Sequence, residues 1–315
     1  MEFSHVPVLF HETVDSLGVR PDGIYVDCTA GGGGHSKAVA DRLSADGRLI
    51  AIDRDPDAVA NLRDKFASRG NVTVVNDNFG NIRSVLDGLG VERVDGIMAD
   101  LGVSSYQLDT AERGFSFHKD APLDMRMSKE GMSAADVVNG YSEQELFRII
   151  ACYGEEKFAR SIARLIVAER AKKPFETTFQ LAETVKNAIP ARARREGGHP
   201  ARRTFQAIRI EVNGEIEHLP DALYSMFGCL KEGGVLSVIT FHSLEDRAVK
   251  QVFRELCTGC RCPKDFPVCV CGRTPAGELP FKSVSPGERE IEENPRSRSA
   301  RLRSIVKLKD HTEQR

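Results

Sequence analysis

The chain has 315 residues, of which 41% are hydrophobic and 29% charged, and its formal net charge is −2. This composition excludes a fibrous or intrinsically disordered protein, and the length favours a large domain with a smaller one. No apolar run approaches the roughly 18 residues of a membrane span, and the N-terminus lacks a basic region followed by an apolar core. We therefore expect a cytoplasmic protein that does not enter a membrane.

The first hundred residues predict strands that alternate with helices. Short apolar runs predict four strands, at 24–28, 48–52, 72–75 and 94–99. Between the second and third, Asp55 and Pro56 form a helix start, with an N-cap and a first-turn proline. Strands separated by helices indicate a parallel sheet built by right-handed crossovers, which is the α/β, Rossmann-like fold class.

A glycine-rich loop follows the first predicted strand. Residues 27–36 read Asp-Cys-Thr-Ala-Gly-Gly-Gly-Gly-His-Ser. Glycines let a ligand approach the backbone, and the amides of the following helix face it, as in Rossmann dehydrogenases and methyltransferases. The three-glycine dinucleotide spacing fails, because Lys37 stands where the third glycine belongs. A purely structural glycine turn is the alternative.

Polar and aromatic residues follow the next two predicted strands. Asp53 comes 20 residues after Gly33, the usual separation for an acid that binds ribose hydroxyls. This position suits NAD and S-adenosylmethionine equally. Phe79 follows the third strand and is placed to stack on an adenine, with ordinary core packing as the alternative.

Asp100 ends the fourth predicted strand, beside the switch point where such sheets bind ligands. In enzymes that methylate amines, this position commonly begins a D-P-P-Y-like tetrapeptide. Here the acid is followed by Leu-Gly-Val, so the prolines and the aromatic residue are absent. A side chain that stacks on the target base must then come from elsewhere, and the candidates are Phe115, Phe117 and Phe241.

The strand pattern stops after the fourth strand. Residues 104–127 form a polar and aromatic stretch without a clear period, and helix-like segments follow it. The strand signal returns at 234–240 and near 302–308. The simplest architecture is an α/β domain at 1–107 and 213–315, interrupted by a helical insertion at 108–212 that we expect to recognise the substrate.

Basic residues gather in two stretches. From Lys186 to Arg209 there are seven Lys or Arg and one acid, and from Arg296 to Lys309 there are six and no acid. Such patches attract a polyanion, with a solvated basic face as the alternative. In the first stretch, the residues that we predict to bind RNA are Arg194, Arg195, Arg202 and Arg203.

Five of the eight cysteines lie between Cys257 and Cys271. Paired thiolates suit tetrahedral zinc, although C-x-C pairs are a weaker signal than C-x-x-C pairs. The candidate metal ligands are Cys260, Cys262, Cys269 and Cys271. Thiols on a loop without a metal fit the pattern as well, and a disulfide is a third alternative.

Eight ordered blocks, spanning about residues 5–307, resemble the MraW/RsmH family of small-subunit ribosomal RNA methyltransferases, which act on a cytidine N4. The blocks are Val8-Leu9 with Glu12, and residues 31–35, 52–56, 100–105, 112–117, 122–127, 204–209 and 241–247. The resemblance implies a methyltransferase fold with a helical insert. It also implies S-adenosylmethionine as methyl donor and 16S rRNA, near the decoding centre of the small ribosomal subunit, as substrate.

The same resemblance implies which residues serve the reaction. It assigns to the methyl donor Gly33, Gly34, His35, Asp53, Phe79, Asp100 and Gln107. Asp100 is also the expected acceptor for the target amine, and His242 either takes the proton afterwards or is a turn residue. Two rival functions are a nicotinamide dehydrogenase, which the missing third glycine opposes, and a non-catalytic RNA-binding protein, which leaves Asp100 without a role.

Overall fold

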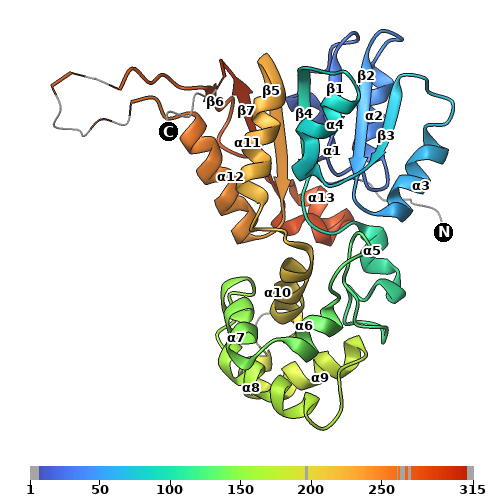
Figure 1. Ribbon diagram of the computed structural model, residues 1–315, viewed down its shortest axis with the longest axis vertical. Helices are drawn as coiled ribbons and strands as arrows, with labels where there is room; N and C mark the ends of the chain where they lie inside the picture. The colour runs from blue at the N-terminus through green and yellow to red at the C-terminus, as the bar shows by residue number, and fades with distance from the viewer. Residues whose placement is uncertain (1–6, 196–197, 261, 263–266, 269–270, 311–315) are drawn as a thin grey trace. The chain divides into compact units, whose positions relative to one another are not determined.

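The computed structural model describes residues 7–195, 198–260, 262, 267–268 and 271–310. The chain divides into two compact units, Met1–Gly102 with Ile216–Arg315, and Val103–Glu215 (Figure 1). We call them the sheet unit and the helical unit. In the described part of the chain, no helix is long and apolar enough to cross a membrane.

The sheet unit contains seven strands in the order β3-β2-β1-β4-β5-β7-β6. Their bounds are β1 Ile24–Asp27, β2 Arg48–Asp53, β3 Val72–Asn76, β4 Val94–Asp100, β5 Leu230–Thr240, β6 Gly277–Glu278 and β7 Arg301–Lys307. Strands β1 to β5 are parallel, whereas β7 is antiparallel to β5 and to β6. The α/β fold class is confirmed, with one antiparallel strand near the edge of the parallel sheet.

Strand β7 departs from the parallel pattern because of how the chain reaches it. After β5, helix α12 (Ser243–Leu256) crosses over to β6, which runs in the same direction as β5. The chain then passes α13 (Glu288–Glu293) and the short η4 (Pro295–Ser299), and β7 returns between β5 and β6. An antiparallel return needs no second crossover.

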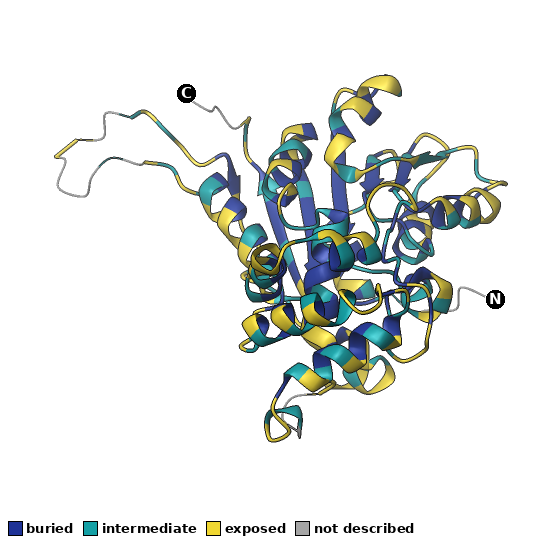
Figure 2. Ribbon diagram, turned by 60° about the horizontal axis from the view of Figure 1, so that its bottom comes forward, coloured by how far each residue is buried: buried dark blue, intermediate teal, exposed yellow. Residues whose placement is uncertain are grey.

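Side chains of the strands alternate between two apolar cores, one on each face of the sheet. Figure 2 shows that most of the central strands are coloured as buried. In β2, Ile50 and Ile52 enter the first core, and Leu49 and Ala51 enter the second. The first core is covered by α4 (Ile82–Gly88), α11 (Leu219–Cys229) and α12, and the second by α1 (Phe10–Ser16), α2 (Gly34–Arg42) and α3 (Pro56–Lys65). Burial on both faces is what a parallel sheet between helices requires.

The helical unit has its own apolar core. Its helices are α5 Ser105–Asp109, α6 Ala134–Gly140, α7 Glu143–Cys152, α8 Ala159–Arg170, α9 Thr178–Ala188 and α10 Arg202–Asn213, with short η2 Ala111–Arg113 and η3 Ala193–Arg195. Ser133, Ser142 and Thr177 begin α6, α7 and α9 with capping boxes, which fix where these helices start.

The stretch at 104–127, expected to lack a period, contains the short α5 and η2, and buried polar side chains hold the rest of it. The amide of Met127 donates to Asn213 Oδ1 over 2.9 Å, and Asn213 Nδ2 donates to the carbonyl of Met125 over 2.8 Å. The guanidinium of Arg113 donates to the carbonyl of Met127 over 2.9 Å. Because side chains supply the hydrogen bonds that these backbone groups need, the segment does not have to form a regular helix or strand.

Candidate active site

The glycine-rich loop joins β1 to α2, and Asp53 at the end of β2 holds it. The Gly31 amide donates to Asp53 Oδ2 over 2.7 Å, and the Asp55 amide donates to Oδ1 over 2.8 Å. Burial raises the pKa of Asp53 to about 6, against the lowering effect of both hydrogen bonds. The carboxylate therefore lies beside the loop, at the edge of the sheet where the parallel strands end.

Two glycines of the loop are required by packing inside the protein. Gly33 has a φ of +73°, and a Cβ there would lie 2.8 Å from Cδ2 of Leu62 on α3. A Cβ on Gly34 would lie 2.2 Å from Cγ of Pro7. These contacts explain Gly33 and Gly34 without a ligand, so their assignment to the methyl donor stays a prediction from the resemblance.

Asp100 ends β4 with a carboxylate that is only partly satisfied. Oδ1 is buried and has no hydrogen-bond partner among the described residues. Oδ2 lies 3.9 Å from Nδ1 of His35, and 28% of the side chain is exposed. Burial raises the pKa of Asp100 well above its ordinary value, and the charges of Asp27 and Glu245 raise it further. A buried acceptor left unpaired costs about 1–3 kcal/mol, and this indicates a site for a ligand that donates.

Asp27 and His35 flank Asp100, and the sequence reasoning gave Asp27 no role. Asp27 accepts hydrogen bonds from Ser36 Oγ over 2.6 Å and from the Thr29 amide over 3.1 Å, and burial raises its pKa to about 6. Burial lowers the pKa of His35 to about 4, so its ring is neutral at pH 7. Asp27 could have been predicted as a site residue because it ends β1, at the edge of the sheet where Asp53 and Asp100 also lie.

His242 is the N-cap of α12. Its Nδ1 accepts a hydrogen bond from the Glu245 amide over 3.4 Å. Glu245 Oε2 in turn accepts from the amides of Phe241, over 2.7 Å, and of His242, over 3.2 Å. His242 Nε2 lies 3.1 Å from Glu245 Oε1 but outside hydrogen-bond geometry. This arrangement favours the turn role over the proton-accepting one, which no contact here tests.

Two other residues assigned to the methyl donor have local structural roles as well. Phe79 begins η1 (Phe79–Asn81) and is half-buried, packed on the first core. Gln107 belongs to the helical unit, where its Oε1 accepts from the Ser104 amide over 3.0 Å while its own amide donates to Ser104 Oγ over 3.2 Å. Gln107 thus completes the capping box of α5. Its contact with the donor stays a prediction.

The three aromatic candidates for base stacking differ in exposure. Phe115 is buried in the helical core, and the Arg113 guanidinium lies 5.8 Å from its ring centroid. Phe241 packs against a small core in the sheet unit. Phe117 is half-buried and stacks on His199, with ring centroids 4.3 Å apart and an interplanar angle of 13°. Phe115 is therefore the least accessible of the three.

The first basic stretch places its arginines in the helical unit. Arg202 and Arg203 are exposed in the first turn of α10, and Arg203 donates to the Glu155 carbonyl over 3.0 Å. Arg194 Nε donates to the Ile189 carbonyl over 2.7 Å. Arg195 ends η3, and its side chain lies outside what the structure describes.

The second basic stretch serves the sheet unit internally. Arg303 pairs with Asp246 of α12 over 2.7 Å. Lys307 is buried, and its Nζ donates to the Leu230 carbonyl over 2.7 Å. At least these two cations are used in folding, so a count of basic residues overstates the charge that this stretch offers to a polyanion.

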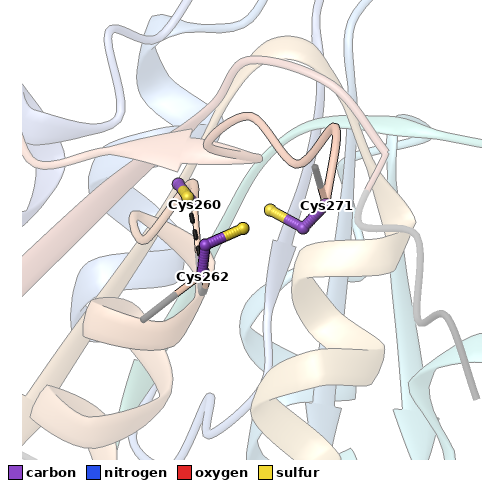
Figure 3. A group of neighbouring side chains, drawn as sticks. All are labelled: Cys260, Cys262 and Cys271. Atoms are coloured by element: carbon purple, nitrogen blue, oxygen red, sulfur yellow. Dashed lines mark hydrogen bonds between the residues drawn. The ribbon is translucent and has the colours of Figure 1, made fainter. Parts of the chain in front are cut away.

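The thiols of Cys260, Cys262 and Cys271 converge in the loop between α12 and β6 (Figure 3). Cys269, the fourth candidate ligand, lies outside the described residues. No hydrogen bond joins the loop to the acidic edge formed by Asp27, Asp53 and Asp100 in the described parts of the chain.

Comparison with known proteins agrees with the resemblance. The profile of the MraW methylase family matches residues 2–308. A protein of Clostridium botulinum (strain Kyoto / Type A2), named Ribosomal RNA small subunit methyltransferase H, is 54% identical over 310 residues, which cover 98% of this chain and 100% of that protein. Proteins with the same name from Lachnospira eligens and Symbiobacterium thermophilum are each 53% identical over 311 residues, covering 98% of this chain and 99% and 98% of theirs. The chain belongs to the MraW methylase family.

Proposed function

We propose that this protein transfers a methyl group from S-adenosylmethionine to the N4 amine of a cytidine in 16S rRNA, near the decoding centre, and that it works in the cytoplasm on the small ribosomal subunit. The observation that carries the proposal is Asp100, whose buried Oδ1 has no hydrogen-bond partner among the described residues. The name shared by the relatives supports rRNA of the small subunit as substrate. The resemblance supports cytidine N4.

The acidic edge of the sheet fits a cationic methyl donor. Asp53, Asp27 and Asp100 end β2, β1 and β4, three parallel strands that lie side by side in the sheet. His35 beside them is neutral at pH 7. A sulfonium cation is attracted by such carboxylates, whereas the neutral thioether left after transfer is not. In this proposal Asp53 accepts the ribose hydroxyls, and the first amides of α2 face the carboxylate of the donor.

Asp100 acts on the acceptor amine. The lone pair of an exocyclic cytosine amine is delocalised into the ring, so the nitrogen is a poor nucleophile until a hydrogen-bond acceptor holds its hydrogens. As the nitrogen–methyl bond forms and the sulfur–methyl bond breaks, positive charge moves from sulfur to nitrogen, and the Asp100 carboxylate stabilises it. The extra proton then passes from the nitrogen to the Asp100 carboxylate that holds it, and from there to water. Because the leaving group is excellent, orientation and electrostatics supply most of the acceleration.

The helical unit supplies an RNA surface in this proposal. Arg202 and Arg203 lie in the first turn of α10, where the helix dipole disfavours positive side chains. A phosphate group bound there would offset this repulsion, because its negative charge is attracted both by the arginines and by the amides at the start of the helix. The target base also has to be unstacked or single-stranded for its amine to be reached.

The direct test is incubation with radiolabelled S-adenosylmethionine and small-subunit RNA at several stages of assembly, followed by nucleoside analysis. We expect label in N4-methylcytidine at one position. Label in another nucleoside would contradict the cytidine N4 assignment, and label in RNA of the large subunit alone would contradict the substrate.

RNA binding gives a second prediction. Arg202→Ala with Arg203→Ala should weaken RNA binding while donor affinity stays unchanged. The salt slope of log K should become shallower by roughly 0.9 for each phosphate that the variant no longer neutralises. Adding Arg194→Ala and Arg195→Ala should reduce the slope further. Filter binding across a salt series measures both the affinity for RNA and the slope.

The matched control is Lys172→Ala with Lys173→Ala, which removes the same charge from exposed positions of the same unit. If this control lowers the salt slope as much as the arginine pair does, the arginines form only a solvated face.

We predict that His242 stabilises helix α12 as its N-cap and does not take part in the methyl transfer. His242→Ala should lower the free energy of unfolding by about 1 kcal/mol, because α12 loses its N-cap. His242→Asn supplies another good cap, so both stability and single-turnover methyl transfer should stay near the wild-type values. Denaturant unfolding and a single-turnover assay measure the two effects. A stable His242→Asn variant without methyl transfer would restore the imidazole as proton acceptor.

A further inference from the structure

Three cysteine sulfurs meet in the loop that joins α12 to β6. Sγ atoms of Cys260, Cys262 and Cys271 all lie within 4.8 Å of one another. Sulfur atoms bound to one tetrahedral zinc are about 3.8 Å apart, since each Zn–S bond is about 2.3 Å long. A disulfide instead needs two sulfurs at about 2.05 Å and has no use for a third. The spacing therefore fits a shared metal ion after a small inward shift.

The thiols come from two arms of the loop, as Figure 3 shows for Cys262 and Cys271, whose side chains are directed toward one another. The amide of Cys262 donates to Cys260 Sγ over 3.4 Å, which fixes the position of this sulfur beside the other two.

The loop is closed at its base and packed between its arms. The Ala276 amide donates to the Leu256 carbonyl over 2.9 Å, which joins the end of α12 to the start of β6. A Cβ on Gly259 would lie only 3.0 Å from Cδ of Pro275, so the two arms run close together. The three thiols thus lie across a narrow loop, where one ion can bridge both arms.

Val268, one of the described residues of this loop, is 70% exposed. Cys257, at the start of the loop, packs against the first core. A link between the two arms of such a loop stabilises the folded protein, because it removes conformations from the unfolded chain.

We propose that Cys260, Cys262 and Cys271 bind a structural zinc ion that clamps the loop between α12 and β6. Thiolate ligands select zinc over hard cations such as magnesium, and in a reducing compartment thiols bind metal in preference to forming disulfides. The site lies apart from the acidic edge and does not depend on the proposed methyl transfer.

The test starts from tag-free protein purified from zinc-supplemented cells under reductant. Elemental analysis is expected to find about one zinc per chain. Cys260→Ser with Cys262→Ser and Cys271→Ser should abolish it, and Cys152→Ser, which removes an exposed thiol of the helical unit, should retain it. Replacement of zinc by cobalt should give thiolate-to-cobalt charge-transfer absorption in the wild type and in Cys152→Ser.

A second measurement needs no variant and keeps the proposal testable if the triple substitution impairs folding. Removing the metal from wild-type protein with a chelator should lower the melting temperature by a few degrees, and added zinc should restore it. Wild-type protein that contains no zinc and gives no cobalt–thiolate absorption overturns the proposal. So does a folded triple variant that keeps its zinc, or an intact mass showing a disulfide among these cysteines under reductant.

Discussion

Asp100→Asn is expected to lower the single-turnover rate of methyl transfer by about two orders of magnitude, the scale seen when one electrostatic stabiliser is lost from an active site. Asparagine keeps the size and one acceptor oxygen but removes the charge that stabilises the developing positive amine. The loss arises in the transition state, so donor affinity should fall much less than the rate. Rapid-quench assays at saturating donor and RNA, with calorimetry for the donor, separate the two effects.

The pH profile gives an independent check on the same residue. Burial first, and then the charges of Asp27 and Glu245, raise the pKa of Asp100. Only the ionised carboxylate accepts hydrogen bonds with both oxygens, so the rate should rise with pH as Asp100 loses its proton. Asp27→Asn removes one neighbouring charge and should therefore move this rise to lower pH. Asparagine can still accept the hydrogen bond from Ser36, which limits the structural disturbance.

Two outcomes would contradict the role of Asp100. If Asp100→Asn turns over at the wild-type rate, Asp100 is a binding or structural residue, and the acceptor has to be sought among residues 104–126 or at His242. If Asp27→Asn leaves the acid limb of the profile in place, the group that titrates there is not Asp100.

Local sequence signals predicted the sheet unit well. The strands expected at 48–52 and 94–99 are observed as β2 and β4, each one residue longer at its carboxyl end. Asp55 caps α3 as expected, since its side chain accepts from the Asp57 amide over 3.0 Å. These features depend on neighbours in the chain, through alternating burial and helix-start chemistry, and sequence order is enough to find them.

Features that depend on residues far apart in the chain could not be predicted from the sequence. The direction of β7 follows from the crossover to β6, and nothing in its own residues encodes it. The packing of Gly34 against Pro7 depends on how the chain before α1 reaches the loop. The pairing of Arg303 with Asp246 removes a cation from a stretch that had been counted as wholly basic. Spacing along the chain carries no information on such contacts.

In the candidate site, too, the sequence predicts which residues lie there but not the contacts that distant residues make with them. Asp53 and Asp100 could be predicted as site residues because acids at the carboxyl ends of parallel strands meet at one edge of the sheet. That Asp100 Oδ1 is buried without a partner among the described residues, and that Asp27 and Glu245 raise its pKa, required coordinates. Burial and charge at a site are sums over many elements, so a sequence motif names the acid but does not give its ionisation.

Asp53→Asn is expected to weaken binding of S-adenosylmethionine by about 10- to 100-fold, the cost of losing charge-assisted hydrogen bonds to the ribose. Burial raises the pKa of Asp53 to about 6. The ionised carboxylate is the form that accepts both hydroxyls, so wild-type affinity should be full above pH 6 and fall as the pH is lowered through that value.

The asparagine variant has no proton to lose at this position, and its affinity should therefore vary less with pH than that of the wild type. Asp27 also has a pKa of about 6, so part of the dependence will remain. Calorimetric titration of both proteins between pH 5 and 8 measures the difference. Asn keeps an acceptor for the Gly31 amide, which distinguishes loss of the ribose interaction from collapse of the glycine loop. Equal affinities, or equal pH dependence, in the two proteins would remove Asp53 from the donor site.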